Sequence, residues 1–320
     1  MVRTSGVLLL LLCGAGSAAG QMPLRQASFI PLWLPQAQFA GYYVALERGI
    51  YRRHGIDLTI LPGGPDQPVS KALQEGQVEF GTLWLSTAIR LRAHGAAIVG
   101  AAQVIQRSSL MLVAKKSSGI HRPSDLNGKK VGVWEGDFLL QPQAFFKQYN
   151  LDVQVVPQAS TVNLFLRDGV SAAVAMWYNE YHTILNSGID ADELTTFFFS
   201  DHNLNFPEDG IYCRADVDRA LCEEFVQASL EGWQDAFAHP EEALDIVMAY
   251  RARHHLPASR THQRWMLARM RDVILPTEAT AALGTLRPQD YDRVAQALRE
   301  NGWIDRVPDF ASFYQGRPAP

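Results

Sequence analysis

The chain has 320 residues, of which 47% are hydrophobic and 19% charged, so its length suits about two domains of roughly 150 residues each. Its 29 basic and 33 acidic residues give a formal net charge of −4, and no stretch is rich in Lys or Arg. This balance argues against a nucleic acid or an anionic membrane surface as the partner. The aromatic content of 10%, with 17 Pro and 24 Gly spread along the chain, argues against a disordered protein.

The first twenty residues have the pattern of a secretory signal. Arg3 precedes an apolar run at residues 7–12, and small residues follow at 14–20. The run is shorter than the roughly 20 residues that a bilayer span needs. Residues 18–20, directly before Gln21, are typical of a cleavage site. We therefore predict a periplasmic or otherwise extracytoplasmic protein; the alternative is an uncleaved N-terminal anchor.

Two of the three cysteines belong to the predicted mature chain. Cys13 would leave with the signal, whereas Cys213 and Cys222 would stay. An exported protein can pair two such thiols as a disulfide. We favour the alternative of two separate buried thiols, because Cys213 falls in a predicted strand and Cys222 in a predicted helix.

Apolar runs of strand length alternate with helical patterns from residue 28 to residue 213, which predicts βαβ units and largely parallel sheets. One series covers residues 28–105 and a second covers 110–199. The remainder is predicted to be helical, with Pro240 and Pro288 in first turns. The predicted fold class is therefore α/β with two lobes, two crossover strands at 110–114 and 210–213, and C-terminal helices. The predicted units are a signal peptide at 1–20, lobe 1 at 21–113 plus 210–320, and lobe 2 at 114–209.

The cleft between the lobes is the predicted ligand site. Ligands of open α/β sheets bind beside the carboxyl ends of the strands, where the loops face the crevice. The loops at these ends are the segment after Leu32 and residues 82–85, 135–138, 160–162 and 177–181. Motifs for phosphate loops, dinucleotide binding, nucleophile elbows and paired metal ligands are absent from the sequence, so we predict no catalytic residue, no metal and no cofactor.

Three tryptophans stand where the chain enters cleft-facing loops. Trp33, Trp84 and Trp177 each offer a flat surface on which a ring could stack. The alternative for each of them is ordinary packing in the core or between the lobes.

The segment from Trp177 to Tyr181 follows a predicted strand and opens a predicted helix. It brings Trp177 and Tyr178 together with the carboxylate of Glu180. Glu180 either interacts with the helix dipole or accepts a hydrogen bond from an amino group or protonated nitrogen of a heterocycle. We favour the second interpretation.

A second strand-to-helix junction carries Gly136, Asp137 and Phe138. Free backbone N–H groups at such a junction can bind an anionic part of a ligand, and a glycine permits close approach. The alternative is a turn glycine followed by an aspartate that caps the helix.

Several motifs together resemble the periplasmic binding proteins of the thiamine-pyrimidine family. They are Trp33-x-Pro35, Phe39 to Ala45, Gly49-x-Tyr51, and the segments 55–57, 62–64 and 125–132. The resemblance covers nearly the whole mature chain. It implies a type II periplasmic binding fold that closes over a small ligand and delivers it to the permease and ATPase of an ABC importer. In pyrimidine binders of the family, the positions of Trp33, Tyr178 and Glu180 contact the ring, and we add Gln38 and Tyr42 from the first matching block as candidate contacts.

The same superfamily contains the aliphatic sulfonate-binding proteins and the thiamine pyrimidine synthases. The lysine that holds pyridoxal phosphate in the synthases, and a nearby histidine, correspond to Leu83 and Thr87 here. Their cysteine-rich run corresponds to the thiol-free segment 203–207. These differences, with the export signal, favour a binding protein over the synthase, which stays as the alternative.

The predicted ligand is a small aromatic heterocycle, first of all a formylated aminopyrimidine precursor of thiamine. Leu32 and Phe39 replace an asparagine and a histidine of the family, so a flavin or another heterocycle is a further possibility. A second alternative is a sensory ligand-binding protein that reports to a membrane receptor instead of an importer.

The processed protein is expected to begin near Gln21, since its apolar segment is too short to anchor it. N-terminal sequencing of protein recovered after export measures this directly. Recovery of residues 1–20 on a membrane-bound form would contradict the prediction.

Overall fold

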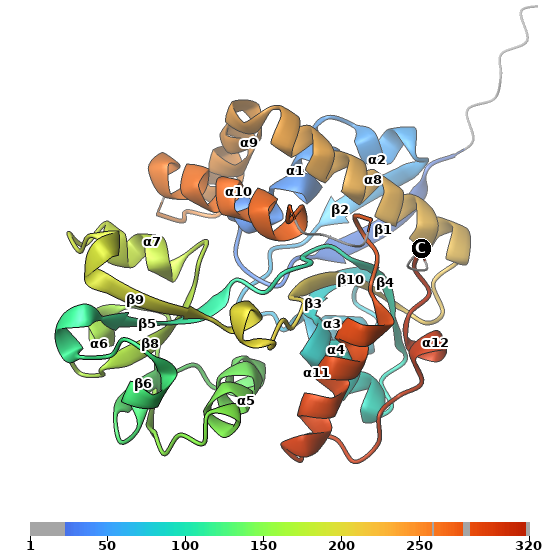
Figure 1. The fold of residues 1–320 in the computed structure, drawn as a ribbon. Helices are drawn as coiled ribbons and strands as arrows, with labels where there is room; N and C mark the ends of the chain where they lie inside the picture. Colours follow the sequence, from blue (N-terminus) through green and yellow to red (C-terminus); the bar gives the residue numbers. More distant parts are fainter. Residues whose placement is uncertain (1–22, 258, 278–281, 318–320) are drawn as a thin grey trace, which may run out of the picture.

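The computed structural model describes residues 23–257, 259–277 and 282–317. Two five-stranded sheets lie side by side, each with its own helices, and the chain passes between them twice (Figure 1). We call each sheet with the helices packed on it a lobe. The predicted signal peptide, including Cys13, lies outside the described residues.

The sheet of lobe 1 has the strand order β2-β1-β3-β10-β4. Strand β1 runs parallel to β2 and β3, whereas β10 runs antiparallel between β3 and β4. The strands are β1 (Arg25–Ile30), β2 (Ile56–Ile60), β3 (Phe80–Trp84), β4 (Ile98–Gln103) and β10 (Asp209–Arg214).

The sheet of lobe 2 repeats this plan in the order β7-β6-β8-β5-β9. Strand β6 runs parallel to β7 and β8, and β5 runs antiparallel between β8 and β9. The strands are β5 (Leu110–Lys115), β6 (Lys130–Val133), β7 (Gln154–Pro157), β8 (Ala172–Met176) and β9 (Leu194–Phe198).

Most helices belong to lobe 1, including the whole C-terminal region. Its helices are α1 (Ala40–Glu47), α2 (Ile50–Arg53), α3 (Val69–Gln74), α4 (Leu85–Ala93), α8 (Arg219–Ala238), α9 (Pro240–Arg253), α10 (Arg260–Ile274), α11 (Pro288–Glu300) and α12 (Phe310–Phe313). Lobe 2 carries α5 (Leu140–Gln148), α6 (Asn163–Leu166) and α7 (Glu180–Leu185). Pro240 and Pro288 occupy first turns as predicted, where a missing N–H costs no hydrogen bond. Within the described ranges, no helix is both long and apolar enough to cross a bilayer.

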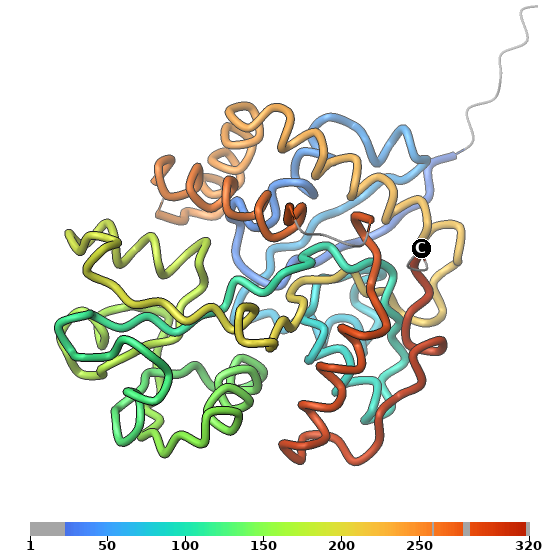
Figure 2. The backbone as a smooth tube through the Cα atoms, viewed as in Figure 1, coloured from blue at the N-terminus to red at the C-terminus, as the bar shows by residue number. Residues whose placement is uncertain are grey.

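The predicted α/β class, with two lobes, two crossovers and C-terminal helices, is confirmed. The predicted crossover strands are β5 and β10, and each lies wholly within one sheet. The passages between the sheets are the segments before them, residues 104–109 and 199–208, which lie side by side (Figure 2). The division into domains at 113/114 and 209/210 stays a prediction, and the two boundaries fall inside β5 and β10.

A buried carboxylate joins the two crossovers. Glu208 is fully buried, and its Oε1 accepts hydrogen bonds from the backbone N–H groups of Ser109 and Leu110. The hydroxyl groups of Ser108 and Ser109 donate to the same carboxylate. Burial raises the pKa of Glu208 to about 8, against the lowering effect of these hydrogen bonds.

Helix α1 packs closely against α8 because each presents a glycine at the contact. A Cβ added to Gly232 would lie 2.2 Å from the carbonyl oxygen of Gly41 and 2.6 Å from the Cβ of Ala45. A Cβ at Gly41 would lie 2.4 Å from the ring of Trp233. Neither helix can therefore carry a larger side chain there without moving apart.

The substitution Gly232→Ala is expected to lower the free energy of unfolding by about 1–3 kcal/mol, because it overpacks the contact between α1 and α8. Urea or thermal unfolding measures the effect. Gln234→Ala in the same helix is the control, since Gln234 is exposed and its loss should change stability by less than about 0.5 kcal/mol. Equal stability of the two variants would contradict the packing account.

Candidate ligand-binding site

A cavity of about 580 Å³ lies between the lobes. Its walls come from the segments that follow β1, β3, β6, β7 and β8, and each of the five predicted loops contributes to them. The lining residues are Leu32, Trp33, Gln36, Gln38, Trp84, Trp134, Glu135, Phe138, Pro157, Gln158, Ala159, Ser160, Met176, Tyr178, Asn179 and Glu180. The cavity is therefore where the carboxyl ends of parallel strands from both sheets meet.

Aromatic side chains from both lobes form most of its apolar surface. Trp84 ends β3 in lobe 1, and its ring meets the ring of Phe138 from lobe 2 edge-on, with centroids 4.5 Å apart. Trp134 packs edge-on against the other side of Phe138 at 5.7 Å. Trp33 and Tyr178 complete the aromatic lining. Such surfaces suit a flat ring held between the lobes.

On the lobe 1 side, two buried glutamines are fixed by a chain of hydrogen bonds. Gln36 donates to Gln38 Oε1 at 2.6 Å, and Gln38 donates to Asp209 Oδ2 at 2.8 Å. Asp209 is the first residue of β10, and burial raises its pKa to about 7. Its Oδ1 atom has no hydrogen-bond partner in the described part of the chain. The position of Gln38 is thus set by the second crossover.

On the lobe 2 side, the cavity offers hydrogen-bond acceptors. Gln158 donates to the carbonyl oxygen of Val174, while its buried Oε1 has no partner among the described residues. Gly132 makes room for that oxygen, since a Cβ at Gly132 would lie 2.6 Å from it. This oxygen is buried beside Gly132 of β6, inside the lobe 2 wall of the cavity.

Glu180 is the second acceptor on this side. Its carboxyl group accepts hydrogen bonds from the backbone N–H of Met176 at 3.0 Å and from the amide of Asn179 at 2.6 Å. Burial raises the pKa of Glu180 to about 7, against the lowering effect of these two bonds. Burial also raises the pKa of Tyr178 well above its ordinary value, so this phenol stays protonated.

The charged side chains among the described lining residues are all acidic. No Lys, Arg or His is found among the described residues that line the cavity, whereas Glu135 and Glu180 are. Sites for sulfonate or phosphate groups commonly use Arg or Lys side chains. The residues present therefore suit a neutral ligand that carries N–H donors.

Six of the ten predicted contact residues line the cavity: Trp33, Gln38, Trp84, Phe138, Tyr178 and Glu180. The other four, Tyr42, Gly136, Asp137 and Trp177, do not. Tyr42 is 1% exposed and lies in the core of lobe 1, where its ring contacts Phe29 at 4.6 Å and Trp233 at 5.9 Å. The stripe of apolar residues on α1 faces this core, so Tyr42 points away from the cleft.

Trp177 is a contact between the lobes. Its carbonyl oxygen accepts a hydrogen bond from the indole of Trp265 on α10 at 3.0 Å. The guanidinium of Arg269 lies over both rings, 4.7 Å from Trp177 and 4.8 Å from Trp265. Trp177 therefore packs between the lobes, which was the alternative to a ligand contact. Its neighbour Tyr178 lines the cavity.

Asp137 also joins the lobes instead of lining the cavity. Its carboxylate accepts hydrogen bonds from Thr87 Oγ1 at 2.7 Å and from Arg90 Nε and Nη2 at 2.9 and 3.0 Å. Both partners stand on α4 of lobe 1. Gly136 takes a left-handed conformation, with φ of 69°, at the start of the turn η4 (Gly136–Leu139). This junction therefore binds the other lobe and presents no free anion site to the cavity.

A second contact between lobes involves two histidines that sequence reasoning missed. His262 on α10 lies 2.9 Å from His182 on α7, between Nδ1 atoms, and 2.8 Å from the amide oxygen of Asn179. Burial lowers the pKa of His262 to about 4, with a further contribution from His182. Asn179 in turn binds Glu180, so this contact reaches the edge of the cavity.

Other lining residues had no signal in the sequence. Trp134 directly follows β6, and its indole donates to the carbonyl of Ala159 at 3.1 Å. Gln36 and Gln158 are single glutamines in loops, a residue type that is common on any surface. Their role depends on where the folded chain places the loops.

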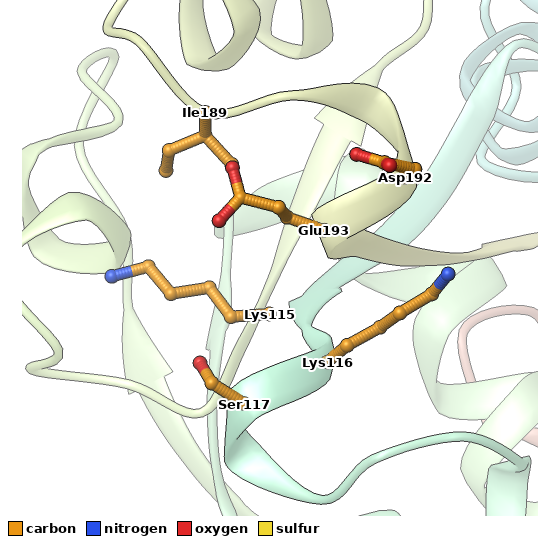
Figure 3. Close-up of a pocket in the computed structure, with 6 residues that line it drawn as sticks. All are labelled: Lys115, Lys116, Ser117, Ile189, Asp192 and Glu193. Carbon is orange, nitrogen blue, oxygen red and sulfur yellow. The ribbon is translucent and has the colours of Figure 1, made fainter.

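A separate hollow of about 380 Å³ lies on lobe 2 at the end of β5. Its lining is Lys115, Lys116, Ser117, Ile189, Asp192 and Glu193 (Figure 3). The two lysine side chains extend in opposite directions, and Lys115 is bound to Asp168 at 2.6 Å. The charged groups do not converge, so the hollow is no second candidate site. Nor do the described residues contain a cluster of three or more His, Cys, Asp or Glu that could hold a metal ion.

The substitution Asp137→Asn is expected to open the ligand-free protein, because it removes the charge that Arg90 binds across the cleft. Charged hydrogen bonds of this kind contribute about 1.5–3 kcal/mol. Small-angle scattering should show a larger radius of gyration than for the unchanged protein. Asp192→Asn, an exposed carboxylate on the same lobe, is the control. If both variants give the same scattering profile as the unchanged protein, Asp137 does not hold the ligand-free lobes together.

Comparison with known proteins identifies the family. Residues 36–243 match the family described as NMT1/THI5 like. The chain is 24% identical over 277 residues to the riboflavin-binding protein RibY of Chloroflexus aurantiacus, covering 78% of each chain. It is 20% identical over 314 residues to the formylaminopyrimidine-binding protein of Halalkalibacterium halodurans, covering 94% of this chain and 92% of that one.

Among solved structures, the periplasmic aliphatic sulphonate binding protein of Escherichia coli has the same fold. The TM-score is 0.71 at 17% identity, covering 92% of this chain and 94% of the other. The resemblance stated from the sequence motifs is confirmed by these matches. The chain has the periplasmic binding protein fold and belongs to the NMT1/THI5 like family.

Proposed function

We propose that this chain is the extracytoplasmic solute-binding protein of an ABC importer, and that it holds a small neutral aromatic heterocycle between its lobes. The lining of the cavity carries the proposal: five aromatic side chains, the carboxyl group of Glu180, and no cation among the described lining residues. A flat ring stacks on the aromatic surfaces, and its amino edge donates to the acceptors of lobe 2.

A formylaminopyrimidine is the first ligand of this class. Its amino group is a further donor for the Glu180 carboxylate, which also accepts from Met176 and Asn179, and a relative that covers most of the chain is named for binding it. A flavin is the second candidate, and the volume of the cavity favours it. Pockets of about 300–1,000 Å³ hold drug-sized ligands, which are larger than one substituted pyrimidine ring. The relative RibY is named for binding riboflavin.

The residues at the synthase positions do not fit pyridoxal phosphate. Leu83 is 1% exposed in β3, in the core of lobe 1. Thr87 donates its hydroxyl to Asp137 in the contact between lobes. A lysine is missing from the described lining of the cavity as well. These features support binding and delivery over pyrimidine synthesis.

An importer is the partner that we propose, with a membrane sensor as the alternative. Binding proteins that close over a ligand can present the closed form to either one. Genes for an ABC permease and ATPase beside the gene for this chain would support transport.

Mass spectrometry of the small molecule that co-purifies tests the ligand class. Calorimetric titration with formylaminopyrimidine, riboflavin and an alkanesulfonate then ranks three chemistries. We expect one of the first two to bind and the sulfonate to fail. Binding of the sulfonate alone would overturn the proposed ligand class.

The substitution Glu180→Gln is expected to weaken binding of an amino-bearing heterocycle about tenfold to a hundredfold, since a buried hydrogen bond to a charged group contributes about 1.5–3 kcal/mol. Glu135→Gln is the matched control, because Glu135 lines the same cavity but is exposed. Equal affinities of both variants for the native ligand would exclude Glu180 as a ligand contact.

The pH dependence of binding gives a second measure of the same contact. The pKa of Glu180 is raised to about 7, so the acceptor form predominates only above that pH. If binding needs the ionised carboxylate, affinity is highest above pH 7 and falls by about tenfold per pH unit below it. This slope should become shallower in Glu180→Gln, and any remaining slope reports the other buried carboxyl groups, Glu208 and Asp209, whose pKa values are raised to about 8 and about 7.

A further inference from the structure

The two cysteines of the mature chain lie against each other, away from the ligand cavity. Their Sγ atoms are 3.1 Å apart. Cys213 is next to last in β10, and Cys222 lies near the start of α8. Both cysteines are free thiols, as the sequence interpretation favoured, but the strand and the helix bring them into contact.

The turn between the two elements is fixed by backbone hydrogen bonds. Ala215 donates to the carbonyl of Ala97, which holds the end of β10 beside β4. Asp218 caps α8 by accepting from the N–H of Leu221, and its carbonyl accepts from the N–H of Cys222. Both thiols are thus held in place by the ends of regular elements, and not by a loose loop.

The contact shifts the pKa values of the two thiols in opposite directions. The hydrogen bond from Cys213 lowers the pKa of Cys222, while the same bond and burial raise the pKa of Cys213. Cys222 is the more exposed of the two. The thiolate is the form that attacks disulfides, so Cys222 is the nucleophile of the pair.

A hollow of about 240 Å³ gives access to both sulfur atoms. Its lining includes three arginines, of which Arg214 is bound to Asp216 and Arg219 to Glu223, each at 2.8 Å. Glutathione disulfide, a small soluble disulfide, serves as the probe of this site.

We propose that Cys213 and Cys222 are a thiol pair that is oxidised to an intramolecular disulfide by exchange with a small disulfide. The Cys222 thiolate attacks one sulfur of the oxidant, whose S–S bond breaks and releases one thiolate. Cys213 then loses its proton to water and attacks the Cys222 sulfur, which releases the second thiolate. Two protein thiols are oxidised, and one disulfide is reduced to two thiols.

The resulting disulfide would link β10 to α8, the longest helix of the described residues. A disulfide needs an S–S distance of about 2.05 Å, so the two sulfur atoms have only about 1 Å to move. The bond closes a short loop and stabilises the fold mainly by restricting the unfolded chain. This site is independent of the proposed ligand and transporter.

Incubation of the mature protein with glutathione disulfide, followed by alkylation in denaturant, tests the proposal. Peptide mass mapping should find residues 213 and 222 linked and unalkylated, and dithiothreitol should restore two alkylated thiols. Two alkylated cysteines without reductant, or a stable glutathione adduct on Cys222 of the unchanged protein, would overturn the pair.

The variant Cys213→Ser separates the two steps of the exchange. It is expected to stop at a glutathione adduct on Cys222, whereas Cys222→Ser should react slowly or not at all. The oxidised wild type should melt several degrees above its reduced form, and reductant should leave the melting of either variant unchanged. Equal reactivity of the two single variants would contradict the assignment of Cys222 as the nucleophile.

Discussion

The carboxylate of Glu208 joins the two passages between the lobes. It is fully buried in one passage and accepts backbone hydrogen bonds from Ser109 and Leu110 in the other. Without it, the buried N–H of Ser109 would lose its acceptor, at a cost of about 1–3 kcal/mol, and the N–H of Leu110 would keep only the Ser108 hydroxyl. The next residue, Asp209, begins β10 and holds Gln38 in the wall of the cavity. One dipeptide therefore fixes both the connection between the lobes and one side of the site.

Two further contacts join the lobes, at two edges of the cavity. At one edge, α4 binds Asp137 through Thr87 and Arg90. At the other, α10 binds lobe 2 through Trp265 and His262. Aromatic rings from both lobes meet between the two edges, as Trp84 and Phe138 do. A ring bound there would contact both lobes at once, which is how a ligand favours the closed arrangement.

Much of the fold and about half of the site follow from local patterns. Apolar runs and their turn residues predict the strands, and parallel strands bring their carboxyl-end loops together, so Trp33, Trp84, Tyr178 and Glu180 were found. Asp137 was misread because its partners lie on a helix about fifty residues earlier in the chain, and only lobe packing brings them together. Gln158 was missed because a single loop glutamine carries no pattern. The contact between the two free thiols was not foreseen, because spacing does not reveal how a strand end meets a helix start.

The charges around the cavity explain why a shared fold need not mean a shared ligand. Glu180 and Asp209 both have pKa values raised to about 7 by burial, and the described lining offers no cation to offset them. A bound anion would face the carboxyl group of Glu180 in a poorly solvated space, and that group would have to take up a proton to accommodate it. The neutral heterocycle that we propose avoids this cost. The periplasmic sulphonate-binding protein has the same architecture, yet ligand choice depends on the side chains at the strand ends, and here the described lining holds two glutamates and no Lys, Arg or His.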